Sequence, residues 1–172
     1  SRHFAAVNWL TSYSLYLDDV GSWFDENVQE DWMAKRGRIM LLLQDESGLE
    51  EIVQLVGMDA LRPPDRLKLE AARSIREDFL HQDAFHEVDT FTPPQKQYKM
   101  LSLVLDYYDA GVKALEDGIG IDGIVKLPVR EAIGRIKYLP AEQVDAEYDR
   151  IVHQMHTEID ELLQQLRAEE DA

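Results

Sequence analysis

The residues best suited to bind a ligand lie in the segment Phe85–Pro94, where Phe85 and Phe91 stand six positions apart before a proline pair. Helical faces repeat every three, four or seven residues, so this spacing favours a loop over a helix. A Pro-rich aromatic loop held between two helices can present its rings to a ligand. The alternative is that both rings close the end of a helical bundle, because buried aromatic side chains mostly serve packing.

Other polar residues give little sign of catalysis or metal binding. His153 and His156 share a helical face with Asp149, and no further ligand occurs at a fixed spacing. Adjacent carboxylates such as Glu50 and Glu51 leave a helix on different sides, so they do not form a catalytic pair. The sequence also lacks the phosphate-binding pattern Gly-x-x-x-x-Gly-Lys-Ser/Thr. We therefore expect no catalytic residue and no metal site in this chain.

Composition restricts the classes of partner. A chain of 172 residues with 45% hydrophobic residues can bury about 70% of its unfolded surface, which is enough for one core. The net charge of −16 argues against nucleic acid and against adsorption on anionic lipid. No apolar run approaches the roughly 20 residues of a membrane span. The absence of cysteine excludes disulfides and suits a reducing cytoplasm.

The elements that would position the aromatic loop are helices, and the expected fold is an all-α antiparallel bundle. Residues 1–14 carry β-formers without helical periodicity, which predicts a short extended N-terminal segment before a bundle domain over 15–172. Ser47-Gly-Leu-Glu50 matches a capping box and predicts a new helix there, ended by Gly57. Helices are expected at 15–27, 30–44, 47–57, 63–81, 92–116, 127–138 and 141–168, with a turn at 58–66 and a loop at 118–126.

Apolar residues predict which faces of these helices are buried. The last helix carries an apolar seam of seven residues at steps of three and four. The seam comprises Val144, Tyr148, Ile151, Met155, Ile159, Leu162 and Leu166. Earlier helices are expected to bury Leu17, Val20, Trp23, Phe24, Trp32, Ile39, Leu42 and Leu43, and then Leu49, Ile52, Val53 and Val56.

The stretch Leu49–Leu61 (LEEIVQLVGMDAL), the helix after it and the Phe85–Pro94 segment closely resemble the C-terminal domain of the catalytic A subunit of archaeal-type (A/V-type) ATP synthases. The opening Arg2–Tyr16 looks like the segment that joins that family's nucleotide-binding domain to its helical domain. The resemblance is specific from Arg2 to about Asp117, and beyond that it rests on helix order.

The resemblance implies an adenine pocket formed by Phe4, Phe85 and Phe91, with ATP or ADP and Mg bound mainly by the preceding domain. Stacking on aromatic rings contributes about 1–3 kcal/mol per base in single-strand binders. The family usually has proline after the first aromatic, whereas Ala5 follows Phe4 here. The resemblance also implies that this chain alone does not hydrolyse ATP, because the family's phosphate-binding loop lies in the preceding domain.

The same resemblance assigns the turn to a contact with the rotating central stalk. The contact residues would be Met58, Asp59, Ala60, Leu61, Arg62, Pro63, Pro64 and Asp65. The turn is rigid and mixed in charge, so steric pushing is favoured over attraction to a basic shaft. Taken as an isolated sequence, it is equally compatible with a well-capped surface turn.

The implied function is the coupling of ATP synthesis or hydrolysis to proton or sodium transport. Expected partners are B subunits of an A3B3-type ring and the central stalk, without nucleic acid or membrane insertion. The complex would be cytoplasmic and peripheral on the inner face of the cell membrane. The alternative is a stand-alone acidic helical adaptor, whose seam from Val144 to Leu166 would pack against a partner helix.

Overall fold

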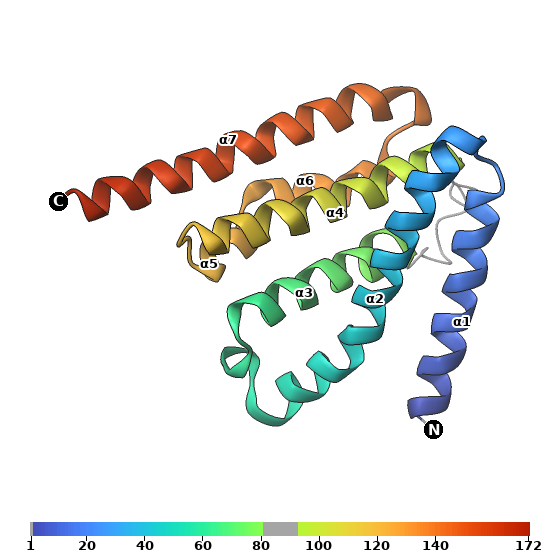
Figure 1. Ribbon diagram of the computed structural model, residues 1–172, viewed down its shortest axis with the longest axis horizontal. Coiled ribbons are helices and arrows are strands. Elements are labelled where there is room, and N and C mark those ends of the chain that lie inside the picture. Colours follow the sequence, from blue (N-terminus) through green and yellow to red (C-terminus); the bar gives the residue numbers. More distant parts are fainter. Residues whose placement is uncertain (1, 81–92) are drawn as a thin grey trace.

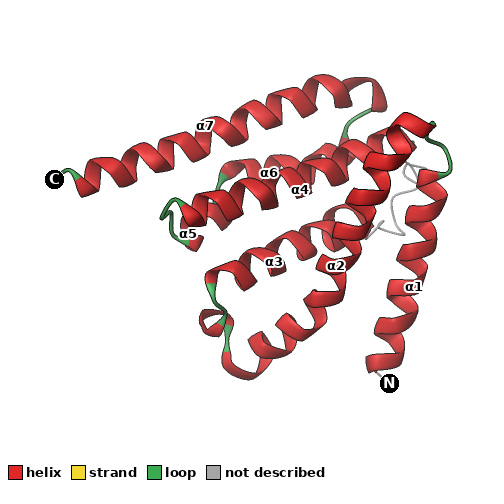
Figure 2. Cartoon of the chain, in the orientation of Figure 1, coloured by secondary structure: helices red, strands yellow, loops and turns green. Residues whose placement is uncertain are grey.

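The computed structural model describes residues 2–80 and 93–172, and the side chains of residues 10–78 and 93–172. In this part of the chain every regular element is a helix, and most are joined by short turns (Figure 2). The all-α bundle is therefore confirmed. The principal helices are α1 (Arg2–Gly21), α2 (Glu26–Val56), α3 (Pro63–Ser74), α4 (Pro94–Glu116), α5 (Ile121–Val125), α6 (Pro128–Arg135) and α7 (Val144–Glu170).

Four shorter elements complete the part of the chain that the structure describes. They are η1 (Met58–Ala60), the π-helix η2 (Ile75–Leu80), η4 (Ile136–Tyr138) and η5 (Ala141–Gln143). Figure 1 shows α4 between α3 and α7, with α1 and the first half of α2 at the end of the molecule where α4 begins. The second half of α2 returns alongside α3, so these two helices form a hairpin whose turn projects from the bundle.

The expectation of an extended segment at residues 1–14 is wrong, because α1 is helical from Arg2. Leu10, Tyr13, Leu17 and Val20 follow one another at steps of three and four, and this face packs into the core. The β-formers weaken helix propensity by only a few tenths of a kcal/mol each, so packing of this face outweighs them.

The junction between α1 and α2 is fixed by close packing around Trp32. A Cβ atom on Gly21 would lie 2.7 Å from the indole, so only glycine lets the ring approach. The indole nitrogen donates to the carbonyl of Leu17 at 3.2 Å, and Phe24 packs edge-on against the ring. The side chain of Asp25 caps α2. Since α1 ends at Gly21, Trp23 falls in the junction and is 65% exposed, against the expectation that it is buried.

The expected break at Ser47 is also wrong, because α2 is continuous from Glu26 to Val56. Ser47 lies in its interior, and Glu50 bonds to Arg73 of α3 instead of closing a capping box. Packing along α3 keeps the helix intact through Gly48. Of the four apolar residues expected to be buried after this point, Leu49 is buried and Val53 is half-buried, whereas Ile52 and Val56 are exposed.

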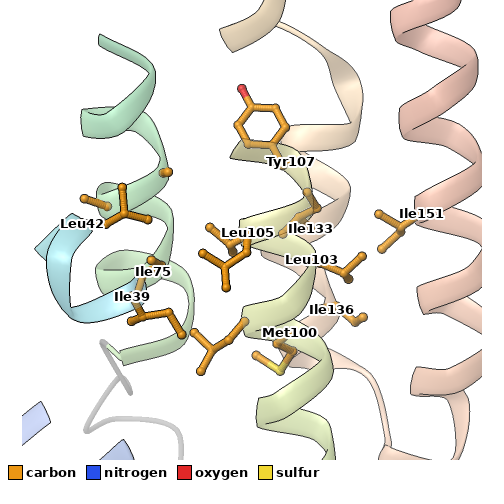
Figure 3. Close-up of a cluster of buried hydrophobic side chains, with 14 of the residues drawn as sticks. Ile39, Leu42, Ile75, Met100, Leu103, Leu105, Tyr107, Ile133, Ile136 and Ile151 are labelled. Atoms are coloured by element: carbon orange, nitrogen blue, oxygen red, sulfur yellow. The ribbon is translucent and has the colours of Figure 1, made fainter. Parts of the chain in front are cut away.

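The core is centred on α4, which has neighbours on most of its sides. Figure 3 shows its side chains directed towards Ile39, Leu42 and Ile75 on one side and towards α6 and α7 on the other. The hydroxyl of Tyr107 donates to the carbonyl of Ile124 at 2.9 Å. That bond fixes α5, a short helix within the segment that was expected to be a loop. The fully buried side chains of α4 include Met100, Leu101, Leu103, Val104, Leu105 and Tyr107.

The apolar seam of α7 packs within this chain. Val144, Ile151 and Met155 are buried in the main core, and the remaining seam residues are partly buried against it. The adaptor hypothesis required the seam to be free for a partner helix, and its first half is occupied by α4 and α6. The seam as a whole is therefore not free for a partner helix, which weighs against that hypothesis.

Candidate functional site at the turn between α2 and α3

The turn starts where Gly57 ends α2. Its φ is +92°, a region that side chains disfavour, so glycine is required there. The amide of Gly57 donates to the carbonyl of Val53 at 2.8 Å, and one turn of 3-10 helix follows in η1. Pro63 then occupies the first turn of α3, where its missing amide proton costs nothing. The predicted turn with a glycine stop and a proline start is confirmed.

A small apolar cluster separate from the main core supports the turn from beneath. Leu61 is 8% exposed and packs with Leu49 of α2 and Leu69 of α3, with Val53 and Met58 at the edge. Leu61 was predicted as a stalk-contact residue; in the structure it lies buried beneath the turn, and a contact with the stalk stays a prediction. Of the other predicted contact residues, Met58 and Asp65 are half-buried, while Asp59, Ala60, Arg62, Pro63 and Pro64 are exposed.

Ion pairs along the hairpin join α2 to α3. Arg73 donates two bonds to the carboxylate of Glu50, at 2.8 and 2.9 Å. One turn further from the tip, Arg76 donates to Glu46 at 2.6 Å. Such paired, partly buried hydrogen bonds resist sliding of one helix along the other. We call these two ion pairs the arginine ladder. The sequence contained a signal for it, because Glu46 and Glu50 are four positions apart and Arg73 and Arg76 are three apart, but the sequence analysis did not identify it.

The two carboxylates of this ladder differ in their electrostatics. The hydrogen bond from Arg73 lowers the pKa of Glu50 below its usual 4.5. Burial raises the pKa of Glu46 in spite of Arg76, because desolvation outweighs the attraction. The second oxygen of Glu46, Oε2, is buried without a hydrogen-bond partner in the described part of the chain. Glu50 therefore favours the closed hairpin at neutral pH, whereas the ionised Glu46 opposes it.

The tip also carries apolar side chains and one further tie to the bundle. Arg66 bonds to Asp122 of α5 at 2.6 Å, which fixes the start of α3. Beside the turn, Ile52, Leu55 and Val56 of α2 are 40%, 83% and 68% exposed. The projecting end of the hairpin is thus rigid, mixed in charge and partly apolar, as expected of a surface that contacts another protein.

The predicted adenine pocket lies largely outside the residues that the structure describes. Phe85 and Phe91 fall in residues 81–92, and of Phe4 only the backbone is described, as part of α1. The adenine pocket formed by these three phenylalanines therefore stays a prediction. It does define the elements on both sides of residues 81–92.

The element before residues 81–92 is held to α6 through one arginine. Arg130 donates to Glu70 of α3 at 3.0 Å and to Asp78 of η2 at 2.9 Å. The same Asp78 carboxylate accepts from Ser74 at 2.9 Å. It also lies against Gly134, where a Cβ atom would approach it to 3.2 Å. Asp78 is thus fixed on three sides, within a π-helical turn of the kind frequently found at functional sites.

The element after residues 81–92 is held to the same part of the bundle. Lys96, in the first turn of α4, is 7% exposed. Its ammonium donates to the carbonyls of Lys137 and Leu139, both at 2.8 Å. The helices on either side of the aromatic segment are therefore both anchored to residues 130–139.

Neither a metal centre nor a membrane span is found among the described residues. Across 2–80 and 93–172, no group of three or more His, Asp or Glu side chains is arranged to hold a metal ion. This includes the region of His153, His156 and Asp149. Within the same ranges no helix is long and apolar enough to cross a membrane.

Comparison with known proteins identifies relatives of this chain. The V-type ATP synthase alpha chain of Acetivibrio thermocellus is 56% identical over 162 residues, which are 94% of this chain and 28% of that protein. The corresponding protein of Clostridioides difficile is 52% identical over 169 residues, or 98% of this chain and 28% of that protein. The chain thus spans little more than a quarter of the length of these relatives.

The match covers the elements that build the site. A family model for the C-terminal domain of V and A type ATP synthase matches residues 21–125, from the end of α1 to the end of α5. These residues include α2, the turn, α3 and α4. This chain therefore belongs to the family of C-terminal domains of V- and A-type ATP synthases.

Proposed function

We propose that this chain is the C-terminal helical domain of a catalytic A (alpha) subunit that couples ATP synthesis or hydrolysis to proton or sodium transport. The domain acts as a lever: closure of the nucleotide-binding domain swings the bundle, and the turn between α2 and α3 pushes the central stalk. The observation that carries this proposal is the rigid, projecting hairpin, held by the Arg73–Glu50 pair and by the apolar cluster of Leu49, Leu61 and Leu69. A soft hairpin would absorb the displacement instead of transmitting it.

The exposed residues of the turn make the contact in this proposal. Asp59, Arg62, Pro63 and Pro64 face outward, while Leu61 holds the turn from beneath. Partners are the B subunits of the ring and the central stalk. The complex is peripheral on the cytoplasmic face of the membrane.

The adenine end of the nucleotide site is the second part of the proposal. Phe4, Phe85 and Phe91 enclose the base of ATP or ADP, and the preceding domain holds the phosphates with Mg. Support comes from both sides of residues 81–92, since Asp78 and Lys96 are each anchored to the bundle. Anchored ends limit the conformations of a segment between them and so reduce the entropy lost when a ligand orders it.

The lever is tested in the full-length complex reconstituted into vesicles. Arg62→Ala combined with Pro64→Ala removes two exposed side chains that make no side-chain hydrogen bond or ion pair in the described structure. We expect ion transport per ATP hydrolysed to fall at least twofold with hydrolysis retained. Gln164→Ala, an exposed change on α7, is the matched control and should leave the ratio unchanged. An unchanged ratio in the double variant contradicts the contact.

The adenine pocket is tested separately by nucleotide binding to the full-length subunit. Phe85→Ala or Phe91→Ala should weaken ADP binding about tenfold, the effect of losing one stacking contact of about 1.4 kcal/mol. Trp23→Ala, which removes an exposed aromatic ring elsewhere, serves as the control. Wild-type affinity in both phenylalanine variants would refute the pocket and leave the lever untouched.

A further inference from the structure

The outer face of α2 is apolar where a surface helix is normally polar. Its core face carries Trp32, Ile39 and Leu49, and four other apolar side chains point the opposite way. Met33, Leu41, Ile52 and Leu55 are 56%, 61%, 40% and 83% exposed and fall within an arc of about 100°. A helix that is apolar on both sides is usually covered on both sides. We call this arc, from Met33 to Leu55, the outer stripe.

Two glycines lie on the outer stripe, and this chain's own packing explains neither. A Cβ atom on Gly37 or Gly48 would meet nothing within 4 Å. By contrast, Gly21 and Gly111 are required by close neighbours, Trp32 at 2.7 Å and Leu67 at 2.9 Å. Glycine inside an exposed helix costs about 0.5–1 kcal/mol relative to alanine. Its presence twice on one face allows another backbone to approach closely.

The charges around the outer stripe are placed at its two ends. Glu30 and Glu51 lie within the same arc and make no ion pair in the described part of the chain. They are separated by 21 positions, or about 32 Å along the helix. The nearby cations are already paired, Arg36 with Asp18 at 2.7 Å and Arg38 with Asp109. Between the two acids the stripe is uncharged.

A hollow adjoins the middle of the outer stripe. It has a volume of about 210 Å³ and is lined by Arg38, Leu41, Leu42, Asp45, Lys68 and Tyr108. Leu41 stands at its edge, and the charged groups of the lining pair with one another or with neighbours. An apolar side chain of a partner placed over Leu41 would find space there, which is the usual setting of an interface anchor.

We propose that the outer stripe binds one amphipathic helix of another protein chain, apolar in its middle and carrying Lys or Arg near both ends. The apolar middle covers Met33, Leu41 and Ile52, and the basic ends face Glu30 and Glu51. A second copy of this chain is a poor occupant, because its net charge of −16 and its own stripe acids would oppose pairing. Ile52 and Leu55 lie beside the turn, but Met33 and Leu41 lie more than two helical turns before it, so the contact at Leu41 does not depend on the stalk contact.

The proposal is tested by photo-crosslinking in the assembled full-length complex. A benzoylphenylalanine at position 41 should link to a different chain, at an apolar residue of a helix with Lys or Arg about ten residues away on each side. The same probe at Gln164, exposed on α7, should not label that helix. Links confined to this chain, to a second copy of it, or to a helix without flanking basic residues would overturn the proposal, as would the absence of any link.

Variants at the glycines test the close approach. Gly37→Gln and Gly48→Gln add uncharged bulk where the fold has open space, and they raise helix propensity. We expect the crosslink yield from position 41 to fall at least fivefold while the melting temperature stays the same or rises. Gln164→Leu is the matched control. Undiminished yield in both glycine variants contradicts a helix lying close to α2.

Discussion

Glu46 and Glu50 stand one helical turn apart on α2, and each accepts a hydrogen bond from an arginine of α3 or of η2 directly after it. Their environments nonetheless push their pKa values in opposite directions. Glu50 gains more from Arg73 than it loses by desolvation, while Glu46 is too deeply buried for Arg76 to compensate. Residues of one type on one face thus contribute with opposite sign to stability.

We predict that Glu50→Gln destabilises the chain at pH 7 and Glu46→Gln does not. The folded pKa of Glu50 is below its unfolded value, so its stabilisation is present above pH 4.5 and disappears as the pH falls through the folded pKa. Its loss should cost about 1 kcal/mol at pH 7. Urea unfolding of the 172-residue chain at pH 7 and pH 3.5 measures both effects.

Glu46→Gln is the matched comparison, because its carboxylate has a raised pKa and is unfavourable when ionised. This variant should unfold at the same urea concentration as wild type or a higher one at pH 7. A larger loss for Glu46→Gln than for Glu50→Gln would show that the arginine pair outweighs the burial of Glu46.

A second prediction at the residue scale concerns two glycines in different surroundings. Gly21→Ala places a methyl group 2.7 Å from the buried indole of Trp32 and should cost about 1–3 kcal/mol. Gly48→Ala meets nothing within 4 Å and should stabilise the chain by about 0.5–1 kcal/mol. Thermal unfolding of the two variants gives the comparison. Equal effects would mean that the contact at Gly21 is relieved by small movements of Trp32.

At the scale of elements, Arg130 is the link between α6 and the end of α3. It bridges Glu70 and Asp78, with its side chain 16% exposed and those of its partners 28% and 18% exposed. Arg130→Ala leaves two partly buried carboxylates without their cation and should cost about 2 kcal/mol. Arg135→Ala breaks only an exposed pair on the same helix and should cost less than about 0.5 kcal/mol.

Chemical denaturation of both arginine variants checks this prediction. Nucleotide binding by full-length Arg130→Ala provides a further readout, since Asp78 lies shortly before the segment assigned to adenine. A stability loss without any change in binding would confine Arg130 to a structural role.

The elements that sequence predicted well are those bounded by glycine and proline. Gly57 and Pro63 gave the turn, because each restricts the backbone by itself. The extended N-terminus and the break at Ser47 failed for a different reason. Both rested on local propensities of a few tenths of a kcal/mol per residue or a single cap, and packing over several turns of helix overrides such terms.

Of the candidate site, sequence could predict the location of the turn but not which of its residues face outward. Leu61 has the same character in the sequence whether it supports the turn or contacts a partner, and only the position of Leu69 on α3 decides between them. The arginine ladder likewise depends on how α2 and α3 are aligned, which is a tertiary relation. The apolar outer stripe was hidden because one of its own residues, Ile52, and the nearby Val56 were assigned to a core face.

At the scale of the whole molecule, the local free energy of opening should decrease from α4 towards the surface. α4 packs against α1, α2, α3, α5, α6 and α7, and its residues 100–105 are all buried. The last residues of α7 project past this core, with 167–172 fully on the surface. A backbone amide exchanges faster where less packing must be broken to expose it to solvent.

We therefore predict a gradient in hydrogen exchange across the 172-residue chain. Peptides covering residues 100–114 should exchange most slowly, at rates set by global unfolding, and those covering 164–172 should exchange within seconds. The hairpin tip at 57–62 should be intermediate, because Leu61 and the arginine ladder hold it. Exchange of the tip that is clearly slower than that of residues 164–172 would mean that the hairpin stays closed in the folded bundle, which is the behaviour required of a rigid lever. Fast exchange of the whole hairpin would instead argue that it bends under load, and the proposed transmission to the stalk would fail.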